Sequence, residues 1–407
     1  MQRGIVTFSL LLAGAAVGPS GVTVQAENWA QFRGSENTGV AAGGELPLNW
    51  IESVAWKVPL PGRGPSSPIV IDRRVYVTCS SGVTQDRLHV LCFDAADGKE
   101  LWERQLWATG RTFCHPSMGV AAPTPASDGQ RIFAFYSSND LACFDLAGNL
   151  QWFRGLAHDY PKAGNDVGMA SSPLVVGKTV IVQIENQGDS FAAGLDTSTG
   201  ETRWRIDRGP QANWASPTLM PGANRADDVV LLQSPDGITA HDPLTGNPLP
   251  WKLMEGCAGI ASPVVTGGVA YIPSNGITAV KAATASSPAE VLWKESKLSP
   301  ASPSPVVYRG VVYAINRAGM LTAGNAKDGS VTWQLRLKGA FWATPVAAGD
   351  HLHLVNSDGV TFAVKLGEKG EIAATGELGE KIQSTPAAAD GALFIRSDGH
   401  LYKIGKK

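Results

Sequence analysis

Two long polar segments, 103–123 and 153–171, carry many of the side chains that could hold a ligand in this 407-residue chain. Aromatic, cationic and imidazole groups on such loops are typical of sites that bind peptides, anions or flat rings. Two tryptophans that each precede a proline by three residues extend the set. The expected binding rim comprises Arg111, Phe113, His115, Arg154, His158, Asp159, Tyr160, Trp214 and Trp342. The alternatives are solvated loops and tryptophans that pack around an internal axis.

The segment 185–189 could supply oxygen ligands to a cation through Glu185, Asn186 and Asp189. Carboxylate and amide oxygens are the ligands that Ca²⁺ prefers. We expect no metal site and keep these three residues as weak candidates. His351 and His353 share one face of a strand without a third ligand nearby, so we expect an ordinary surface strand there.

The composition excludes several classes of protein. The net charge is −2, from 34 basic and 36 acidic residues without long runs, which argues against nucleic acid as a partner. Only 17% of residues are charged, whereas Gly (46), Pro (26) and Trp (12) are abundant. Disorder and coiled coils are therefore excluded, and short strands joined by tight turns are favoured.

Residues 1–26 read as a cleavable signal peptide. Arg3 is followed by an apolar run over 5–17, and small residues end at Ala26. The run is too short to span a membrane comfortably, and no cysteine follows it as a lipid-anchor signal. We expect a periplasmic or secreted protein with a leader segment over 27–52 and no transmembrane span.

The five cysteines are an odd number, so at least one is unpaired. Cys92 and Cys143 occupy matching positions in two similar strands. We expect buried thiols that act as small apolar side chains. A bridge between Cys79 and Cys92 is the alternative.

A repeat organises the rest of the chain. A Ser/Thr-Pro step followed by small or β-branched residues recurs at intervals of 40 to 57 residues. Each step opens a unit of four short strands, which is the unit of a β-propeller blade. The anchor prolines are Pro68, Pro125, Pro173, Pro217, Pro263, Pro305, Pro345 and Pro386. We therefore predict an all-β fold over 53–407, an eight-bladed β-propeller of four-stranded blades.

A tryptophan on the fourth strand keeps step with the prolines, and we expect it to cover the neighbouring blade. These residues are Trp56, Trp102, Trp152, Trp204, Trp251, Trp293 and Trp333, whereas the equivalent position before Pro386 is Ala374. The last unit has three strands, and the strand at 54–58 precedes the first unit. We predict that this N-terminal strand completes the last blade and closes the ring.

The segments 194–204 and 240–251 resemble the tryptophan-docking repeat of quinoprotein-type propellers, whose pattern is small-x-Asp-x-x-Thr-Gly-x-x-x-Trp. The opening 29–34 is similar to the leader of secreted bacterial proteins with this repeat. WD-type and kelch-type repeats fit less well. The resemblance covers about residues 29–407 and identifies the chain as a member of the pyrroloquinoline quinone (PQQ) repeat family.

The resemblance implies two functional classes. One comprises enzymes that hold PQQ and Ca²⁺ in a central funnel and oxidise alcohols or sugars. The other comprises cofactor-free scaffolds such as BamB, which bind peptide segments. The chain has no adjacent cysteine pair and lacks the extra length of the alcohol dehydrogenases. We therefore expect a monomeric, non-catalytic scaffold for protein or peptide segments of the cell envelope, without a cofactor. A small PQQ- and Ca²⁺-dependent oxidoreductase is the alternative.

Overall fold

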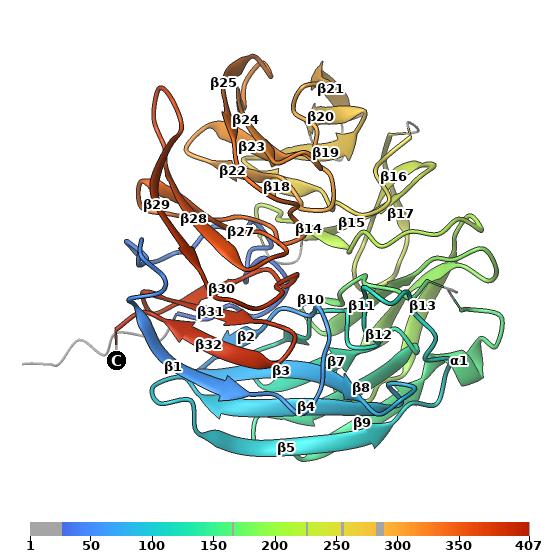
Figure 1. Cartoon of the computed structure of the whole chain (residues 1–407). Helices are drawn as coiled ribbons and strands as arrows, with labels where there is room; N and C mark the ends of the chain where they lie inside the picture. Colours follow the sequence, from blue (N-terminus) through green and yellow to red (C-terminus); the bar gives the residue numbers. More distant parts are fainter. Residues whose placement is uncertain (1–26, 165–166, 225–226, 254–255, 282–288, 407) are drawn as a thin grey trace, which may run out of the picture.

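The structure is a computed structural model that describes residues 27–406, apart from 165–166, 225–226, 254–255 and 282–288. The expected signal peptide, 1–26, lies outside the described residues. Eight four-stranded antiparallel sheets follow one another in chain order around a ring (Figure 1). The predicted all-β propeller is therefore confirmed. Among the described residues, no helix is both long and apolar enough to span a membrane.

The first four blades contain the following strands. Blade 1 is formed by β2 (Ile69–Ile71), β3 (Arg74–Ser81), β4 (Arg87–Asp94) and β5 (Glu100–Trp107). Blade 2 is formed by β6 (Ala126–Ser127), β7 (Arg131–Phe135), β8 (Asp140–Asp145) and β9 (Leu150–Gly155), and α1 (Leu156–Asp159) follows it. Blade 3 is formed by β10 (Leu174–Val176), β11 (Thr179–Ile184), β12 (Phe191–Asp196) and β13 (Thr202–Asp207). Blade 4 is formed by β14 (Thr218–Met220), β15 (Val229–Ser234), β16 (Gly237–His241) and β17 (Pro248–Leu253).

The last four blades complete the ring. Blade 5 is formed by β18 (Val264–Thr266), β19 (Val269–Ser274), β20 (Gly276–Lys281) and β21 (Glu290–Glu295). Blade 6 is formed by β22 (Val306–Tyr308), β23 (Val311–Ile315), β24 (Met320–Asn325) and β25 (Val331–Arg336). Blade 7 is formed by β26 (Val346–Ala348), β27 (His351–Val355), β28 (Val360–Lys365) and β29 (Glu371–Glu377). Blade 8 is formed by β30 (Ala387–Ala389), β31 (Ala392–Arg396), β32 (His400–Ile404) and β1 (Val54–Pro59).

The N-terminal strand closes the ring as predicted. Strand β1 pairs antiparallel with β32, and Val58 lies opposite Leu401 (Figure 1). Glu380 ties this seam, because it accepts hydrogen bonds from Lys57 of β1 and from Tyr402 of β32. The two edge strands of blade 8, β30 and β1, come from opposite ends of the chain. Because β1 pairs with β32, the last strand of the chain is not left as a free edge.

The outer-strand tryptophans join neighbouring blades, as expected. All seven donate an indole Nε1–H to a backbone carbonyl of the next blade, over 3.0–3.4 Å. Trp152 of β9, for example, donates to Thr197 O of blade 3 over 3.0 Å. Its ring lies against Gly200, whose φ is +72° and where an added Cβ would approach the indole to 2.7 Å. The glycine of the docking repeat is therefore needed both for backbone conformation and for space.

The leader 27–52 packs on the face of the ring at the ends of the inner strands. Trp29 forms a backbone bridge with Val70 of blade 1, and Val40 forms one with Ala347 of blade 7. Trp29 and Trp50 are buried in the hydrophobic core shared with blades 1, 7 and 8. The leader therefore crosses this face of the ring and is part of the folded unit.

The expectation of a surface strand at His353 is wrong. Its side chain is fully buried and stacks on Trp50 of the leader, with ring centroids 6.3 Å apart. Neither ring nitrogen of His353 has a hydrogen-bond partner. Burial, and less strongly the nearby His351, lowers the pKa of His353 to about 4. The leader, which belongs to no repeat, therefore contributes Trp50 to the surroundings of this histidine.

None of the five cysteines, all of which lie in described segments, forms a disulfide bond, and Cys79, Cys92 and Cys143 are buried. The alternative bridge between Cys79 and Cys92 is not formed. In the β3–β4 register Cys79 lies opposite His89, and Cys92 lies opposite Tyr76. The two thiols therefore occupy different levels of the hairpin, and Cys79 and Cys92 act as apolar core side chains.

Candidate functional site

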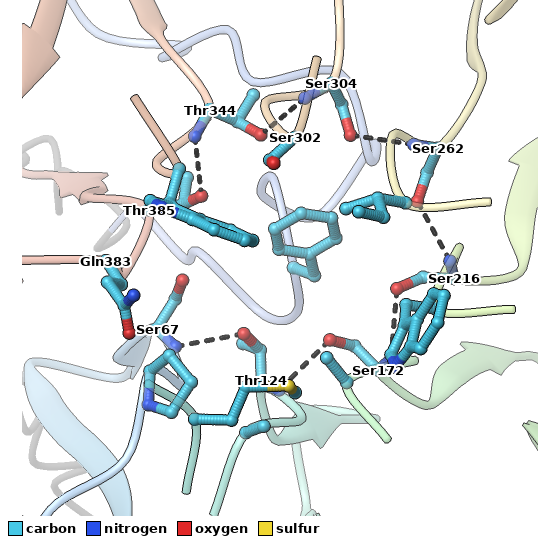
Figure 2. Close-up of a pocket in the computed structure, with 18 of the residues that line it drawn as sticks. Ser67, Thr124, Ser172, Ser216, Ser262, Ser302, Ser304, Thr344, Gln383 and Thr385 are labelled. Atoms are coloured by element: carbon cyan, nitrogen blue, oxygen red, sulfur yellow. Dashed lines mark hydrogen bonds between the residues drawn. The ribbon is translucent and has the colours of Figure 1, made fainter. Parts of the chain in front are cut away.

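A cavity of about 380 Å³ opens along the axis of the ring, and we call it the funnel. Its wall combines hydroxyl side chains from all eight blades with apolar side chains from the inter-blade loops (Figure 2). The apolar and aromatic contributors are Phe32, Pro65, Met118, Ala122, Val167, Ala170, Trp214, Ile260 and Trp342. Cavities of this size accommodate small ligands or a few residues of a peptide.

Eight hydroxyl groups form a ring around the narrow part of the funnel, and we call it the hydroxyl ring. Each belongs to the residue before an anchor proline, so the repeat itself places one hydroxyl per blade. The members are Ser67, Thr124, Ser172, Ser216, Ser262, Ser304, Thr344 and Thr385, each 4% exposed or less. Figure 2 shows them arranged around a common centre, with hydrogen bonds running from one residue to the next. Proline, which has no N–H, leaves the preceding residue to make the contact between blades.

Each hydroxyl except that of Ser67 accepts a hydrogen bond from the backbone N–H of its equivalent in the preceding blade. These seven bonds measure 2.9–3.1 Å. None of the eight hydroxyls donates its own proton to another group in the described part of the chain. A hydroxyl has one proton and two lone pairs, so the ring retains a set of donors for a ligand or for water.

The ring of hydrogen bonds is interrupted at the seam between blades 8 and 1. No bond joins Thr385 to Ser67 in the described structure, and Gln383 lies beside this gap in Figure 2. Arg396 of β31 crosses the same seam, donating to Ser66 Oγ over 3.1 Å and to Thr78 O over 2.9 Å. The buried Arg396 guanidinium therefore replaces the hydroxyl contact where the two ends of the chain meet.

The floor of the funnel is made by the leader. Phe32 lines the cavity, and the next residue, Arg33, is fully buried with its guanidinium 5.2 Å from the Phe32 ring. Arg33 donates to Asn37 Oδ1 of the leader over 3.1 Å and more weakly to Ser262 O over 3.5 Å and Thr218 Oγ1 over 3.4 Å, and its Nε has no partner. Burial lowers the pKa of Arg33 to about 9, so the group remains charged at neutral pH.

Neither Arg33 nor Arg396 forms an ion pair with any described carboxylate. An unpaired buried charge is unfavourable by several kcal/mol, on the order expected for a desolvated ion. Both guanidiniums contact residues of the hydroxyl ring or their immediate neighbours, Ser262 and Ser66. Neither arginine lines the funnel, so both positive charges lie buried behind its wall.

A recess of about 310 Å³ shares part of its lining, including Trp342 and Gln383, with the funnel. Its charged side chains are Arg63, Asp358, Lys381 and Asp398. Arg63 donates to Met118 O over 2.7 Å and so holds the loop that ends at Met118. The mouth of the funnel therefore carries charges of both signs, whereas its deeper wall has none.

Three of the nine predicted rim residues line the funnel: His115, Trp214 and Trp342. Trp342 is 42% exposed, and Trp214 donates its indole N–H to Gly168 O over 2.8 Å. Arg111 and Phe113 lie on the same loop as His115 and are exposed outside the lining, Phe113 by 62%. The structure thus brings the aromatic residues of three different loops to one mouth.

The other four predicted rim residues lie away from the funnel, around α1 at the outside of the ring (Figure 1). Arg154 pairs with Asp159 and also donates to Gly200 O of the next blade. Tyr160 packs on Phe191, with ring centroids 4.5 Å apart. His158 is exposed on α1. The contacts of Arg154 and Tyr160 hold blades 2 and 3 together.

The weak cation candidates also lie outside the funnel lining. Glu185 is buried and accepts a hydrogen bond from Arg208 Nε over 2.6 Å, and burial raises its pKa. Asp189 pairs with Arg205 over 2.7 Å, and the Asn186 side chain bonds within its own loop. No group of three or more His, Cys, Asp or Glu side chains in the described parts of the chain is arranged to hold a metal ion.

The hydroxyl ring and the floor were not among the predicted site residues. The ring could have been found from the repeat, because a Ser or Thr precedes every anchor proline. Phe32 and Arg33 carry no such signal, since the leader is outside the repeat and its path beneath the funnel depends on packing.

A family model described as outer membrane protein assembly factor BamB matches residues 51–167, 161–286 and 276–373. These matches cover well over half of the chain. The chain belongs to this family. A search of curated proteins finds no match to it.

Solved structures with a similar fold include a BamB protein and dehydrogenase enzymes. BamB from Moraxella catarrhalis is 17% identical, with 87% of this chain and 97% of that chain covered and a TM-score of 0.63. Quinohemoprotein alcohol dehydrogenase from Comamonas testosteroni is 14% identical, with coverage of 94% and 81% and a TM-score of 0.68. A europium-containing methanol dehydrogenase is 13% identical, with coverage of 93% and 98% and a TM-score of 0.66. At these identities the likeness of this BamB-family chain to each structure concerns the fold alone.

The PQQ and Ca²⁺ of the quinoprotein class require a particular donor set. Ca²⁺ takes six to eight oxygen ligands, usually with carboxylates among them, and the quinone requires cationic groups and a base nearby. The described lining of the funnel offers hydroxyls, Gln383 and the imidazole of His115, but no carboxylate, lysine or arginine. The two carboxylates of the recess, Asp358 and Asp398, are exposed at the mouth. These residues do not fit PQQ with Ca²⁺.

Proposed function

We propose that this BamB-family chain is an exported, non-catalytic binding module that captures protein or peptide segments of the cell envelope at the mouth of its funnel. The observation that carries the proposal is the funnel wall, which is apolar and aromatic with hydroxyl donors and has no charged side chain among its described residues. Such a wall can bury apolar side chains and bond to a peptide backbone.

The rim supports the same function. Trp342 and Phe113 are 42% and 62% exposed, and large exposed aromatic side chains are enriched where proteins bind partners. His115, Trp214 and Trp342 would make the direct contacts, and Arg111 and Phe113 would extend the surface. The apolar run and small residues within 1–26 support export, and a single closed ring supports a monomer.

The experiment compares peptide capture with quinone binding on the same purified protein. An envelope-derived peptide pool is passed over wild type and Trp342→Ala, and both proteins are separately incubated with PQQ and CaCl₂. We expect peptides to be retained by wild type and released by the variant, without co-elution of quinone absorbance. Quinone that co-elutes in a 1:1 ratio and supports dye reduction by alcohols or sugars would overturn the proposal.

A further inference from the structure

The funnel shows an imbalance between hydrogen-bond donors and acceptors at its narrow end. The eight hydroxyls of the ring are buried, and seven of them already accept a backbone N–H, for example Ser216 from Ser172 over 2.9 Å. Their protons have no acceptor in the described part of the chain. A group that fills this end must therefore be rich in lone pairs.

The buried arginines next to the hydroxyl ring also favour a ligand that is rich in lone pairs. Arg33 is fully buried and donates to the neutral Asn37 side chain, to Ser262 O of the ring and to the nearby Thr218, yet it has no carboxylate partner among the described residues. Arg396 is likewise buried without an ion pair and donates to Ser66, the residue next to Ser67 of the ring. Because no acidic side chain lines the funnel, a ligand is the natural source of the compensating negative charge.

The rest of the funnel wall is of a different kind. Trp214, Ile260 and Trp342 each lie two residues before a ring residue in the chain, and they line the cavity together with Met118 and Val167. Hydroxyls of Ser117 and Ser302 are interspersed among them. A lipid tail could not bond to these polar groups, whereas the backbone of an extended peptide could, while its side chains contact the tryptophans.

From this complementarity we propose that the funnel recognises the carboxyl-terminal end of an extended polypeptide. The terminal carboxylate accepts hydrogen bonds from the hydroxyl ring, in the field of the Arg33 guanidinium, and the last apolar side chains pack against Trp214 and Trp342. The rest of the partner leaves through the open mouth. This inference rests on the proposed function and specifies which part of the partner enters the site.

The test uses two pools of N-acetylated tetrapeptides with randomised positions, identical except that one ends in a free carboxyl group and the other in an amide. Equal amounts are offered to the immobilised wild-type protein, and the retained peptides are quantified by mass spectrometry. We expect the free-acid peptides to be enriched at least tenfold over the amides, with apolar residues at the last position. The ring and its charge are intact in this comparison, so it does not depend on a variant that folds poorly.

The two proposals can fail separately. If acids and amides are retained equally, the carboxyl-terminal inference is overturned and the binding function stands. If neither pool is retained, both are overturned. Free-acid peptides that bind Trp342→Ala as tightly as wild type would place the binding outside the funnel and would also overturn the inference.

Arg33→Met provides a second readout, because it removes the charge and keeps an apolar side chain of similar length. An enriched free-acid peptide should bind this variant at least tenfold more weakly, whereas its amide should bind both proteins alike. An equal loss for acid and amide would assign Arg33 a structural role only and would contradict its part in the recognition.

Discussion

Each ring hydroxyl performs two tasks with one oxygen atom. Its lone pair accepts the N–H of the preceding blade, as in the 3.0 Å bond from Thr124 to Ser172, and its proton remains for a ligand. The same residue type therefore stabilises the ring and lines the site. Truncation of one hydroxyl would disturb both, so exposed tryptophans of the mouth are better probes of binding.

Trp342→Ala should weaken peptide binding at least tenfold, because it removes a partly exposed indole from the funnel wall and leaves the blade core intact. The expected change in the free energy of unfolding is below about 0.5 kcal/mol, as for other surface substitutions. Binding is measured by fluorescence anisotropy with a retained peptide, and unfolding by urea titration. Trp107→Ala is the matched control, since Trp107 is exposed but does not line the funnel. Equal losses in both variants would refute the role of Trp342.

His353 should make the stability of the protein depend on pH. Its pKa is about 4 in the folded chain because of burial and, to a smaller extent, His351, and about 6.5 when unfolded. The unfolded chain therefore binds the proton more readily between these values, so stability is complete above pH 6.5 and falls as the pH decreases toward 4. The loss is on the order of 3 kcal/mol.

Urea titrations at pH 7 and pH 5 measure this effect. His353→Leu should reduce the difference between the two pH values, whereas His158→Leu, which changes an exposed histidine, should leave it unchanged. The same pH dependence in wild type and His353→Leu would show that His353 is not its source.

At the scale of elements, the stability of the ring comes from contacts that repeat between neighbouring blades. Every blade junction except that between blades 7 and 8 carries a docked tryptophan, and Ala374 occupies the equivalent position of β29. The indole contributes both apolar burial and one hydrogen bond. The ionic contacts of Glu380 at the seam and of Glu185 with Arg208 occur once each, so they are not part of the repeat.

Trp152→Ala should destabilise the protein by about 3–5 kcal/mol, the usual range for removing a large buried aromatic side chain. Gly200→Ala should destabilise it by the same mechanism, because a Cβ would lie 2.7 Å from the indole at a φ of +72°. Leu150→Ala is the control, since Leu150 is on the same strand and 49% exposed. Thermal and urea unfolding measure the three variants. A Trp152→Ala protein as stable as the control would contradict the docking account.

Glu380, at the seam between the two ends of the chain, allows a test of how the ring closes. Burial alone would raise the pKa of Glu380, but hydrogen bonds from Lys57, Ser397, His400 and Tyr402 outweigh it and lower the pKa to about 2. Because this value is below the ordinary 4.5, the stabilisation is present above pH 4.5 and is lost as the pH falls toward 2. Glu380→Gln should therefore lower the unfolding midpoint at pH 7 and flatten the acid limb of the stability curve. If the acid limb of the stability curve were the same in Glu380→Gln and wild type, the ionised Glu380 carboxylate would not be a source of the stability of the closed ring.

Repeats explain which parts of the structure could be predicted. The blades, the docking tryptophans and the closing strand β1 each follow from a pattern that occurs many times, so errors in one unit are corrected by the others. The leader occurs once and belongs to no repeat, so its path could not be predicted from a pattern. The positions of the buried Arg33 and His353 were therefore missed. The loop after β9 shows the same limit: Tyr160 packs on Phe191 outside the funnel, whereas Val167 and Ala170, later in the same loop, line it.

At the scale of the whole molecule, the leader and the ring form one site. The ring supplies eight inward hydroxyls, and the leader closes the far side with Phe32 and the buried charge of Arg33. The result is a funnel lined by hydroxyl, apolar and aromatic side chains, with the buried cation of Arg33 behind its floor. This arrangement favours a ligand with an anionic end and an apolar body.

Photo-crosslinking in cells that naturally produce the chain tests this account most directly. A photo-reactive residue replaces Ile260 in the funnel wall or, as the control, Leu150 on the outer strand β9. Mass spectrometry identifies the crosslinked peptides. The account predicts that Ile260 yields crosslinks to the carboxyl-terminal peptide of an envelope protein and that Leu150 does not. Absence of crosslinks from Ile260, or the same products from both positions, would contradict it.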